Sequence, residues 1–297
     1  MERLIKHWLA EYKTVLIQVI VLGLCYYAWQ SDFSFIRNHY FSIWHHGVYS
    51  SPFQTKQHFR LLSVGSDWHA SSKLRQSARA WKLPLQIHGI GRAFPGMISK
   101  LRYLQEAIST LHDSDIIMVV DAYDVFVHAG EEKIIKAFKS MGKDLVFSAE
   151  NWIFPDVEVG KIYPDIPQSI LFRYVNSGGS VGYVKAYRQM LKDIMRDTMV
   201  DAMGKKHTVE SDQRLFTKYF LQNPDKVTLD YQQKIFSNLN DLFDYRYFSF
   251  EKKGIYNHIT NTTSLVFHGN GVTGKVYLEA LYKEAKRQIH TAPRKHD

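Results

Sequence analysis

Cysteine is almost absent from this chain of 297 residues, which contains only Cys25. A single cysteine excludes an intramolecular disulfide framework, and it also excludes zinc or iron–sulfur sites built from cysteine ligands. Internal repeats and low-complexity tracts are missing as well. Hydrophobic residues make up 45% and charged residues 23% of the chain, which excludes intrinsic disorder and collagen-like repeats. The length suits one large α/β domain or two small ones.

Acidic residues are fewer than basic ones, with 29 Asp+Glu against 38 Lys+Arg and a formal charge of +9. This excess fits nucleic acid, a membrane or a substrate that carries phosphates, and it equally fits ordinary surface variation. Nucleic-acid binding predicts basic clusters interleaved with aromatic residues, whereas these basic residues are scattered, with a mild excess over 283–295. We therefore expect no nucleic-acid partner.

The longest uncharged apolar run is Thr14–Trp29. As a helix it reaches about 24 Å, slightly short of the ~30 Å hydrocarbon core, and local bilayer thinning or its aromatic flank closes that gap. Basic residues before the run favour a cytosolic N-terminus. We interpret the run as a single-pass membrane anchor. The alternatives are a cleaved signal peptide, although no small-residue cleavage site follows the run, and a buried helix of a soluble domain, which the position of the run near the N-terminus disfavours.

This interpretation divides the chain into a cytosolic tail (1–13), a transmembrane anchor (14–29), a stem (30–57) and a catalytic domain (58–297). The domain then lies on the luminal side of the secretory pathway, in the endoplasmic reticulum or Golgi. The triplet Asn261-Thr262-Thr263 is a possible glycosylation acceptor and is consistent with a luminal domain.

From Phe59 onward, short apolar runs alternate with amphipathic segments. The pattern predicts strands over 59–66, 85–90, 115–120 and 144–148, and helices over 71–81, 98–111 and 131–141. The almost wholly apolar run at 115–120 is typical of a central parallel strand that is covered on both faces. This βαβα order predicts a doubly wound α/β sheet, in which ligands bind beyond the carboxyl ends of the strands.

Two carboxylates, Asp121 and Asp124, follow the third predicted strand directly. Such a pair is costly beside apolar residues unless a cation neutralises it. Hard oxygen ligands suit Mg²⁺ or Mn²⁺, so the pair is a candidate metal site. The alternative is a pair that only caps a turn or the next helix.

Three further clusters combine polar and small residues. His268 ends an apolar run and precedes Gly269 and Asn270, whose turn offers backbone N–H groups to a phosphate, with Lys275 nearby. Asn176 precedes two glycines, a place where a ligand can approach the backbone closely. Asp212 opens a predicted helix. The alternatives are a core histidine, a glycine-rich turn and a helix cap.

Six strings carry these clusters: VVDAYDVFV, LVFSAE, YVNSGGSVGY, SDQRLFTKYF, LDYQQKIF and VFHGNG. Together, over about residues 59–275, they resemble the glycosyltransferase domain of the multifunctional procollagen lysyl hydroxylases and related stand-alone family members. The resemblance implies a GT-A-like, Rossmann-type α/β fold whose mostly parallel sheet is flanked by helices. It also implies a UDP-sugar donor (UDP-glucose or UDP-galactose), a Mn²⁺ ion, and transfer of a hexose to hydroxylysine or galactosyl-hydroxylysine of a collagen-like protein.

The resemblance also implies roles for individual residues. Asp121, Asp124 and His268 match the metal ligands. The nucleotide side of the site is matched by Val64, Ser66, Phe94, Lys100, Tyr123, Gly269, Asn270 and Lys275, and the sugar and acceptor side by Asn176 and Asp212.

Three departures from the family pattern affect the residues around base and sugar. Phe94 stands where the family has Trp, in a shorter loop, Phe154 replaces another Trp, and the acidic run before Gln213 is reduced to Glu210, Ser211 and Asp212. Lys275, in addition, follows an extra residue in its loop. Donor and acceptor identity therefore stay open. The alternatives are a Golgi-type glycosyltransferase with another glycan or lipid acceptor, and an inactive scaffold that binds collagen.

Overall fold

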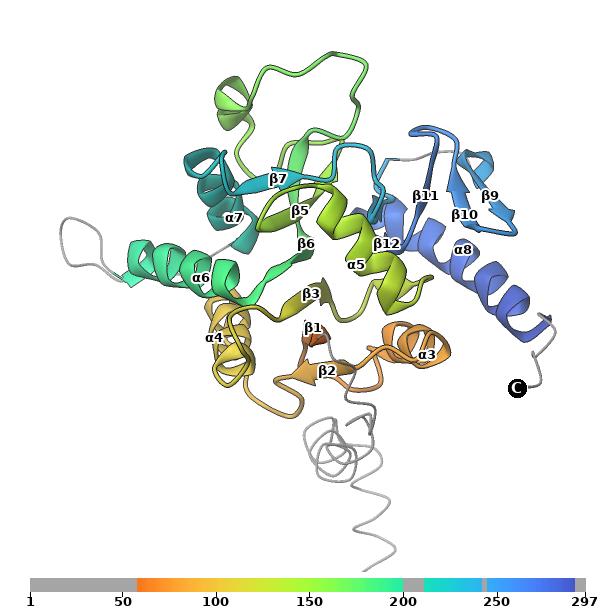
Figure 1. The fold of residues 1–297 in the computed structure, drawn as a ribbon, viewed down its shortest axis with the longest axis horizontal. Coiled ribbons are helices and arrows are strands. Elements are labelled where there is room, and N and C mark those ends of the chain that lie inside the picture. Colours follow the sequence, from red (N-terminus) through yellow and green to blue (C-terminus); the bar gives the residue numbers. More distant parts are fainter. Residues whose placement is uncertain (1–57, 200–210, 242–244, 292–297) are drawn as a thin grey trace, which may run out of the picture.

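The computed structural model describes residues 58–199, 211–241 and 245–291 (Figure 1). A six-stranded sheet in the order β2-β1-β3-β6-β5-β7 forms its centre. The strands are β1 (Phe59–Val64), β2 (Leu85–His88), β3 (Ile116–Asp121), β5 (Leu145–Glu150), β6 (Tyr174–Tyr183) and β7 (Val227–Leu229). All of them are parallel except β6, which runs antiparallel to β3 and β5. The prediction of a mostly parallel sheet is confirmed.

The apolar character of β1 and β3 follows from their place inside the sheet. Successive side chains of a strand point to opposite faces, so a strand covered on both faces is apolar throughout. In β3, Ile117 and Val119 belong to the core on one face, while Ile116, Met118 and Val120 belong to the core on the other.

Helices cover both faces of this sheet (Figure 1). On one face α3 (Ser72–Ala80) and α5 (Glu131–Ser140) contribute to one core cluster. On the other face α4 (Met97–Ile108), α6 (Val184–Met199) and α7 (Asp212–Gln222) pack against one another over the second cluster. The three helices predicted from periodicity, α3, α4 and α5, all form within a few residues of their expected bounds. This layered α/β arrangement fits a GT-A-like fold.

Two smaller sheets and a long helix complete the domain. The first sheet, in the order β4-β12-β8, consists of β4 (Val125–Val127), β12 (Val266–His268) and β8 (Phe236–Asn238). The second is the antiparallel sheet of β9 (Phe248–Glu251), β10 (Gly254–Asn257) and β11 (Thr262–Ser264), preceded by the short helix η2 (Tyr245–Tyr247). Helix α8 (Gly271–Thr291) follows β12. The first sheet brings His268 beside the turn between β3 and β4, because His268 pairs with Val125.

The glycine-rich string at 174–183 forms the central strand β6 and not a turn. Glycine is unfavourable in a strand unless another group comes close to its backbone, and that is the case here. A Cβ atom on Gly179 would lie 2.8 Å from the ring of Phe236, and one on Gly182 would lie 2.6 Å from the carbonyl oxygen of Asp144. These glycines therefore allow the tight packing of the strand.

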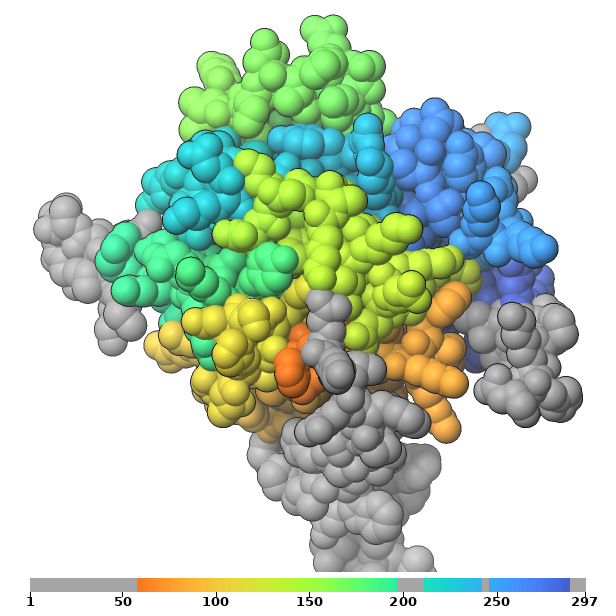
Figure 2. All heavy atoms as spheres, viewed as in Figure 1, coloured from red at the N-terminus to blue at the C-terminus, as the bar shows by residue number. Residues whose placement is uncertain are grey.

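The segment between β5 and β6, residues 151–173, includes the short helix η1 (Val157–Ile162) and stands out at the top of the molecule (Figure 2). The proposed anchor at 14–29 and stem at 30–57 lie outside the described residues. Among the residues that the structure does describe, we find no helix with the length and apolar character needed to cross a bilayer.

Candidate active site

A cleft of about 490 Å³ opens at the carboxyl edge of the sheet. Its walls come from the ends of β1 and β3, the start of α4, the first residue of α7 and the first turns of α8. Eight of the residues proposed from the sequence line it: Val64, Phe94, Lys100, Asp121, Tyr123, Asp124, Asp212 and Lys275. The carboxyl ends of the strands thus hold these side chains together, as expected for a doubly wound sheet.

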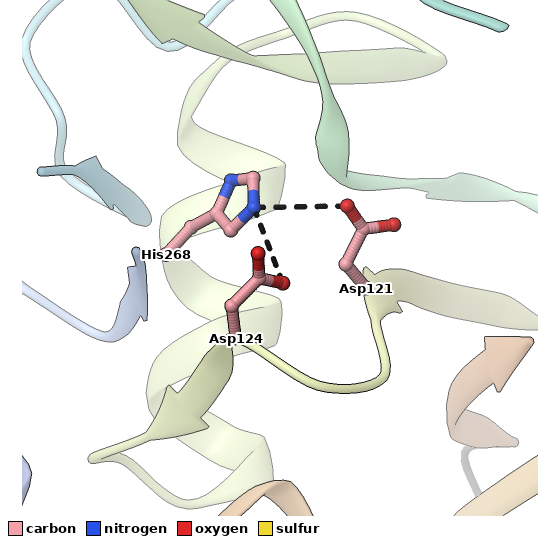
Figure 3. A group of neighbouring side chains, drawn as sticks. All are labelled: Asp121, Asp124 and His268. Carbon is pink, nitrogen blue, oxygen red and sulfur yellow. Dashed lines mark ion pairs between the residues drawn. The ribbon is translucent and has the colours of Figure 1, made fainter. Parts of the chain in front are cut away.

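Asp121 and Asp124, which line this cleft, lie beside His268, and the three side chains point toward one another (Figure 3). The Nε2 atom of His268 lies 3.6 Å from Asp121 Oδ2 and 3.6 Å from Asp124 Oδ1. One ligand atom from each residue lies within 4.8 Å of the others. An ion with bonds of about 2.1 Å accepts ligand atoms roughly 3–4.2 Å apart, so this trio fits a small divalent cation.

Two asparagine side chains determine which nitrogen of His268 faces the carboxylates. Nδ1 lies 3.0 Å from Asn176 Oδ1 and 3.0 Å from Asn238 Oδ1. Asn176 Oδ1 also accepts from the backbone N–H of Gly178, and Asn238 Nδ2 donates to the carbonyl of Ala149, so neither amide can turn round without losing a backbone partner. Nδ1 therefore carries the hydrogen, and Nε2 presents its lone pair to the metal position.

Gly178 makes room for the imidazole. A Cβ atom on Gly178 would lie 2.1 Å from Cε1 of His268. Any other residue at position 178 would therefore displace the ring, which explains a glycine inside the buried strand β6.

Lys100 connects the metal position to Asp212. Its Nζ atom lies 2.7 Å from Asp121 Oδ1 and 2.7 Å from Asp212 Oδ2, and both Lys100 and Asp212 are buried. Ser177 Oγ donates a further hydrogen bond to Asp212 at 3.1 Å. Burial opposes both charges, but the ion pairs outweigh it, so the pKa of Lys100 is raised and that of Asp212 is lowered. Lys100 and Asp212 are therefore both charged at neutral pH.

Burial and neighbouring charges also act in opposite directions on Asp124 and His268. Burial opposes the charge of Asp124, yet the neighbouring ring of His268 lowers its pKa. Burial likewise opposes charge on His268, while Asp124 and Asp121 raise its pKa. A divalent cation competes with a proton for the Nε2 position.

An aromatic wall forms the outer side of the cleft. The ring of Tyr123 is 40% exposed, and its hydroxyl accepts hydrogen bonds from the backbone N–H groups of Ser66 at 2.7 Å and Asp67 at 2.9 Å. These bonds hold the ring upright beside the end of β1. Phe94, 37% exposed, lines the same cleft. An aromatic base could stack between such surfaces.

Gly269, Asn270 and Lys275 form a group that the sequence analysis placed on the nucleotide side of the site, and they do not all line the cleft. The N–H of Gly269 donates to the carbonyl of Asp124 at 2.8 Å, and Asn270 is buried with its amide hydrogen-bonded to Glu150. Only Lys275 of this group lines the cleft, where it is exposed. Gly269 and Asn270 therefore lie behind the metal position and support it.

Two buried residues of the site, Glu150 and Asn238, are not indicated by the sequence analysis. Asn238 holds His268, and Glu150 accepts hydrogen bonds from Asn176, Gln213 and Asn270. Both end strands whose carboxyl ends lie at this edge. That position at a strand end is the signal that could have identified them.

Comparison with known proteins identifies the family. A family model described as the PLOD GT domain matches residues 55–291. The chain belongs to this family. The matched range contains the whole described domain, including the metal-binding trio and the cleft around it. The resemblance inferred from the six strings is confirmed.

Curated relatives agree with this assignment. The chain is 29% identical over 218 residues to procollagen-lysine,2-oxoglutarate 5-dioxygenase 1 of Gallus gallus and 30% identical over 223 residues to procollagen-lysine,2-oxoglutarate 5-dioxygenase of Drosophila melanogaster. It is 28% identical over 214 residues to the multifunctional procollagen lysine hydroxylase and glycosyltransferase LH3 of Rattus norvegicus. These matches cover 68%, 69% and 67% of this chain, and 28%, 29% and 27% of the relatives. The chain therefore spans less than a third of the length of each.

Proposed function

We propose that this protein is a Mn²⁺-dependent glycosyltransferase that moves a hexose from a UDP-sugar to an acceptor hydroxyl. The acceptor class that we favour is hydroxylysine or galactosyl-hydroxylysine in a collagen-like protein. The observation that carries the proposal is the convergence of Asp121, Asp124 and His268 at an aromatic-walled cleft, in a chain of the PLOD GT domain family.

The metal-binding trio would hold the ion through two carboxylate oxygens and Nε2 of His268. A bound Mn²⁺ supplies Lewis-acid stabilisation of the negative charge on a diphosphate leaving group. Lys100 and Lys275 add positive charge on two sides of the cleft. Because Lys100 is buried and fixed by two carboxylates, its charge is in place before a donor binds, and such preorganised charge favours the departure of an anion.

The outer wall suits the nucleoside of a UDP-sugar. Tyr123 offers an exposed ring, and Phe94 offers a second apolar surface where the family pattern has Trp. Val64 and Ser66, at and just beyond the end of β1, lie at the same side of the cleft. A base stacked on Tyr123 would lie within reach of the backbone at this strand end.

Asp212 is the group we assign to the sugar or acceptor hydroxyl. It lines the cleft beside Lys100, and its lowered pKa keeps it ionised and able to accept a hydrogen bond. Asn176 lies behind His268 and hydrogen-bonds to its ring. We therefore propose that Asn176 orients that ring and does not contact the sugar directly.

We also propose a secretory-pathway location, with residues 14–29 as a membrane anchor and the described domain in the lumen. Asn261 is compatible with modification there, since it is exposed in the turn between β10 and β11. Two other functions remain as outcomes of the test below: transfer to a different glycan or lipid, and binding of collagen without catalysis.

A donor screen tests this function. UDP release should be measured with UDP-glucose, UDP-galactose and UDP-N-acetylhexosamines, with and without Mn²⁺, in the presence of collagen peptides or simple sugars. We expect release with one UDP-hexose that depends on Mn²⁺, and a loss of about a thousandfold in Asp121→Asn. Asp144→Asn, at the opposite edge of the sheet, is the control. Release only with simple glycans or lipids would favour the alternative enzyme, and no release with any donor would favour the scaffold.

A further inference from the structure

Glu150, the last residue of β5, is a buried carboxylate with no role in the reaction described above. It is 5% exposed, and no ion pair to it forms among the described residues. Three amide groups surround it instead. Oε1 accepts from Gln213 at 2.7 Å and Asn176 at 3.2 Å, and Oε2 accepts from Asn270 at 2.8 Å. Burying a carboxylate without a cation is costly even when it is hydrogen-bonded, so its retention here calls for a reason.

The side-chain amides of Asn176, Gln213 and Asn270 must point their NH₂ groups at Glu150. Each amide oxygen is already occupied by at least one backbone N–H: Asn176 by Gly178, Gln213 by Ser177, and Asn270 by Leu239 and Asn240. Three donors therefore converge on one side chain. Only an acceptor on both of its oxygens satisfies all of them, and an ionised carboxylate provides that. Burial raises the pKa of Glu150, and the hydrogen bonds from Gln213 and Asn176 oppose that rise.

Each amide also leads to a different part of the site. Asn176 accepts from Nδ1 of His268. Gln213 follows Asp212 in α7, and its Oε1 atom accepts from the backbone N–H of Ser177. The hydroxyl of Ser177 in turn donates to Asp212. Asn270 holds the chain just after β8, the strand that ends with the second partner of His268. One carboxylate thus connects the metal ligand to the helix that carries Asp212.

We propose that Glu150 is a positioning residue for the metal site: it holds Asn176 with its oxygen toward Nδ1 of His268 and so keeps Nε2 of that ring directed at the ion. This inference rests on the metal site of the proposed function. A partner that accepts the second ring N–H of a ligating histidine commonly fixes its tautomer and raises its basicity. Here the carboxylate acts one step further away, through an amide.

The variant Glu150→Gln tests this role, since it keeps the shape and removes the charge. Its single amide oxygen cannot replace both carboxylate oxygens, so Asn176 or Asn270 loses its acceptor. A second variant, Glu150→Ala, removes both acceptor oxygens and so disturbs Asn176 in any case. We expect Mn²⁺ alone, titrated into the full chain, to bind about 10–100-fold more weakly than in the wild type. Asp115→Asn is the matched control, because Asp115 is also 5% exposed but directly precedes β3, at the opposite edge of the sheet. We expect it to bind Mn²⁺ like the wild type, and thermal melts of all these variants report any general loss of structure.

The imidazole itself gives a second readout. Long-range ¹H–¹⁵N NMR of the metal-free protein, recorded at a pH where His268 is neutral, should show the Nδ1–H tautomer in the wild type. Glu150→Gln should add a population of the Nε2–H tautomer, because a turned Asn176 presents NH₂ to Nδ1. Should Glu150→Gln fail to fold, Asn176→Ala removes the same link between Glu150 and His268 and should by itself weaken Mn²⁺ binding.

Wild-type Mn²⁺ affinity and an unchanged His268 spectrum in both Glu150→Gln and Glu150→Ala would overturn the inference and leave the proposed function intact. In the double variant with Asn176→Ala, full additivity of the two losses would also overturn it, because Glu150 would then not act through Asn176. No Mn²⁺ binding by the wild-type protein would contradict the proposed function instead. In that case the NMR spectrum of His268 would by itself test the role of Glu150.

Discussion

Two cavities of similar size lie at opposite edges of the central sheet. The cavity at the amino edge, about 520 Å³, is slightly larger than the cleft of about 490 Å³ at the carboxyl edge. Its charged side chains, among them Asp113, Asp144, Lys185 and Lys226, are all exposed to solvent. At the carboxyl edge, in contrast, Lys100 and Asp212 are buried and paired, and Asp121 and Asp124 face a buried imidazole.

The difference is one of charge placement and not of volume. Exposed charges are solvated and separate, so they make no fixed field. Charges held out of water at fixed positions are costly to maintain, and they make a site ready to bind a charged ligand. The smaller cavity is therefore the better candidate for the active site. Variants at matched positions of the two edges test this comparison.

The largest effect on stability is expected for Lys100. Lys100→Met leaves buried Asp212 without its cation, and removing one partner of a buried pair costs about 3–5 kcal/mol in the free energy of unfolding. Lys185→Met, at the exposed amino edge, should change it by less than about 0.5 kcal/mol. Urea denaturation of both variants measures the two values. Equal losses in the free energy of unfolding of the two variants would contradict the difference proposed between the two edges of the sheet.

A smaller effect concerns pH. The pKa of Asp212 is lowered from its usual value of 3.8, since Lys100 outweighs the opposing effect of burial. A lowered pKa in the folded state means that Asp212 stabilises the fold above pH 3.8 and that this contribution is lost as the pH falls below it. Asp212→Asn should therefore be less stable than the wild type at pH 7 and should lose less stability between pH 5 and pH 2.

Asp144→Asn, in the exposed cavity, is the control for the removal of a solvent-exposed carboxylate. Denaturation curves at several pH values measure the slopes. A slope in Asp212→Asn as steep as that of the wild type would contradict the assignment of the buried pair.

The parallel part of the fold was predictable because its signals are local. Apolar runs such as 115–120 and amphipathic segments such as 98–111 need no knowledge of distant residues. Strand β6 was not predictable in this way, since its glycines become favourable only when Phe236 and His268 pack against them. Both partners are distant in the sequence, so tertiary packing overrides the local preference.

The candidate site divides in the same way. Asp121 and Asp124 stand out because two carboxylates follow an apolar strand, and the family strings add His268. The strand-end position of Glu150 is a weaker signal, because a single glutamate at the end of a strand is usually exposed. Its importance depends on three amides that come from β6, α7 and the loop before α8. Only the folded arrangement brings these together.

Mn²⁺ titration by calorimetry tests the central assignment most directly. We expect one Mn²⁺ site in the wild-type protein, loss of that site in Asp124→Asn, and an unchanged site in Asp144→Asn at the amino edge. Mn²⁺ binding in Asp124→Asn with the affinity of the wild type would contradict the metal site on which the proposed catalysis depends.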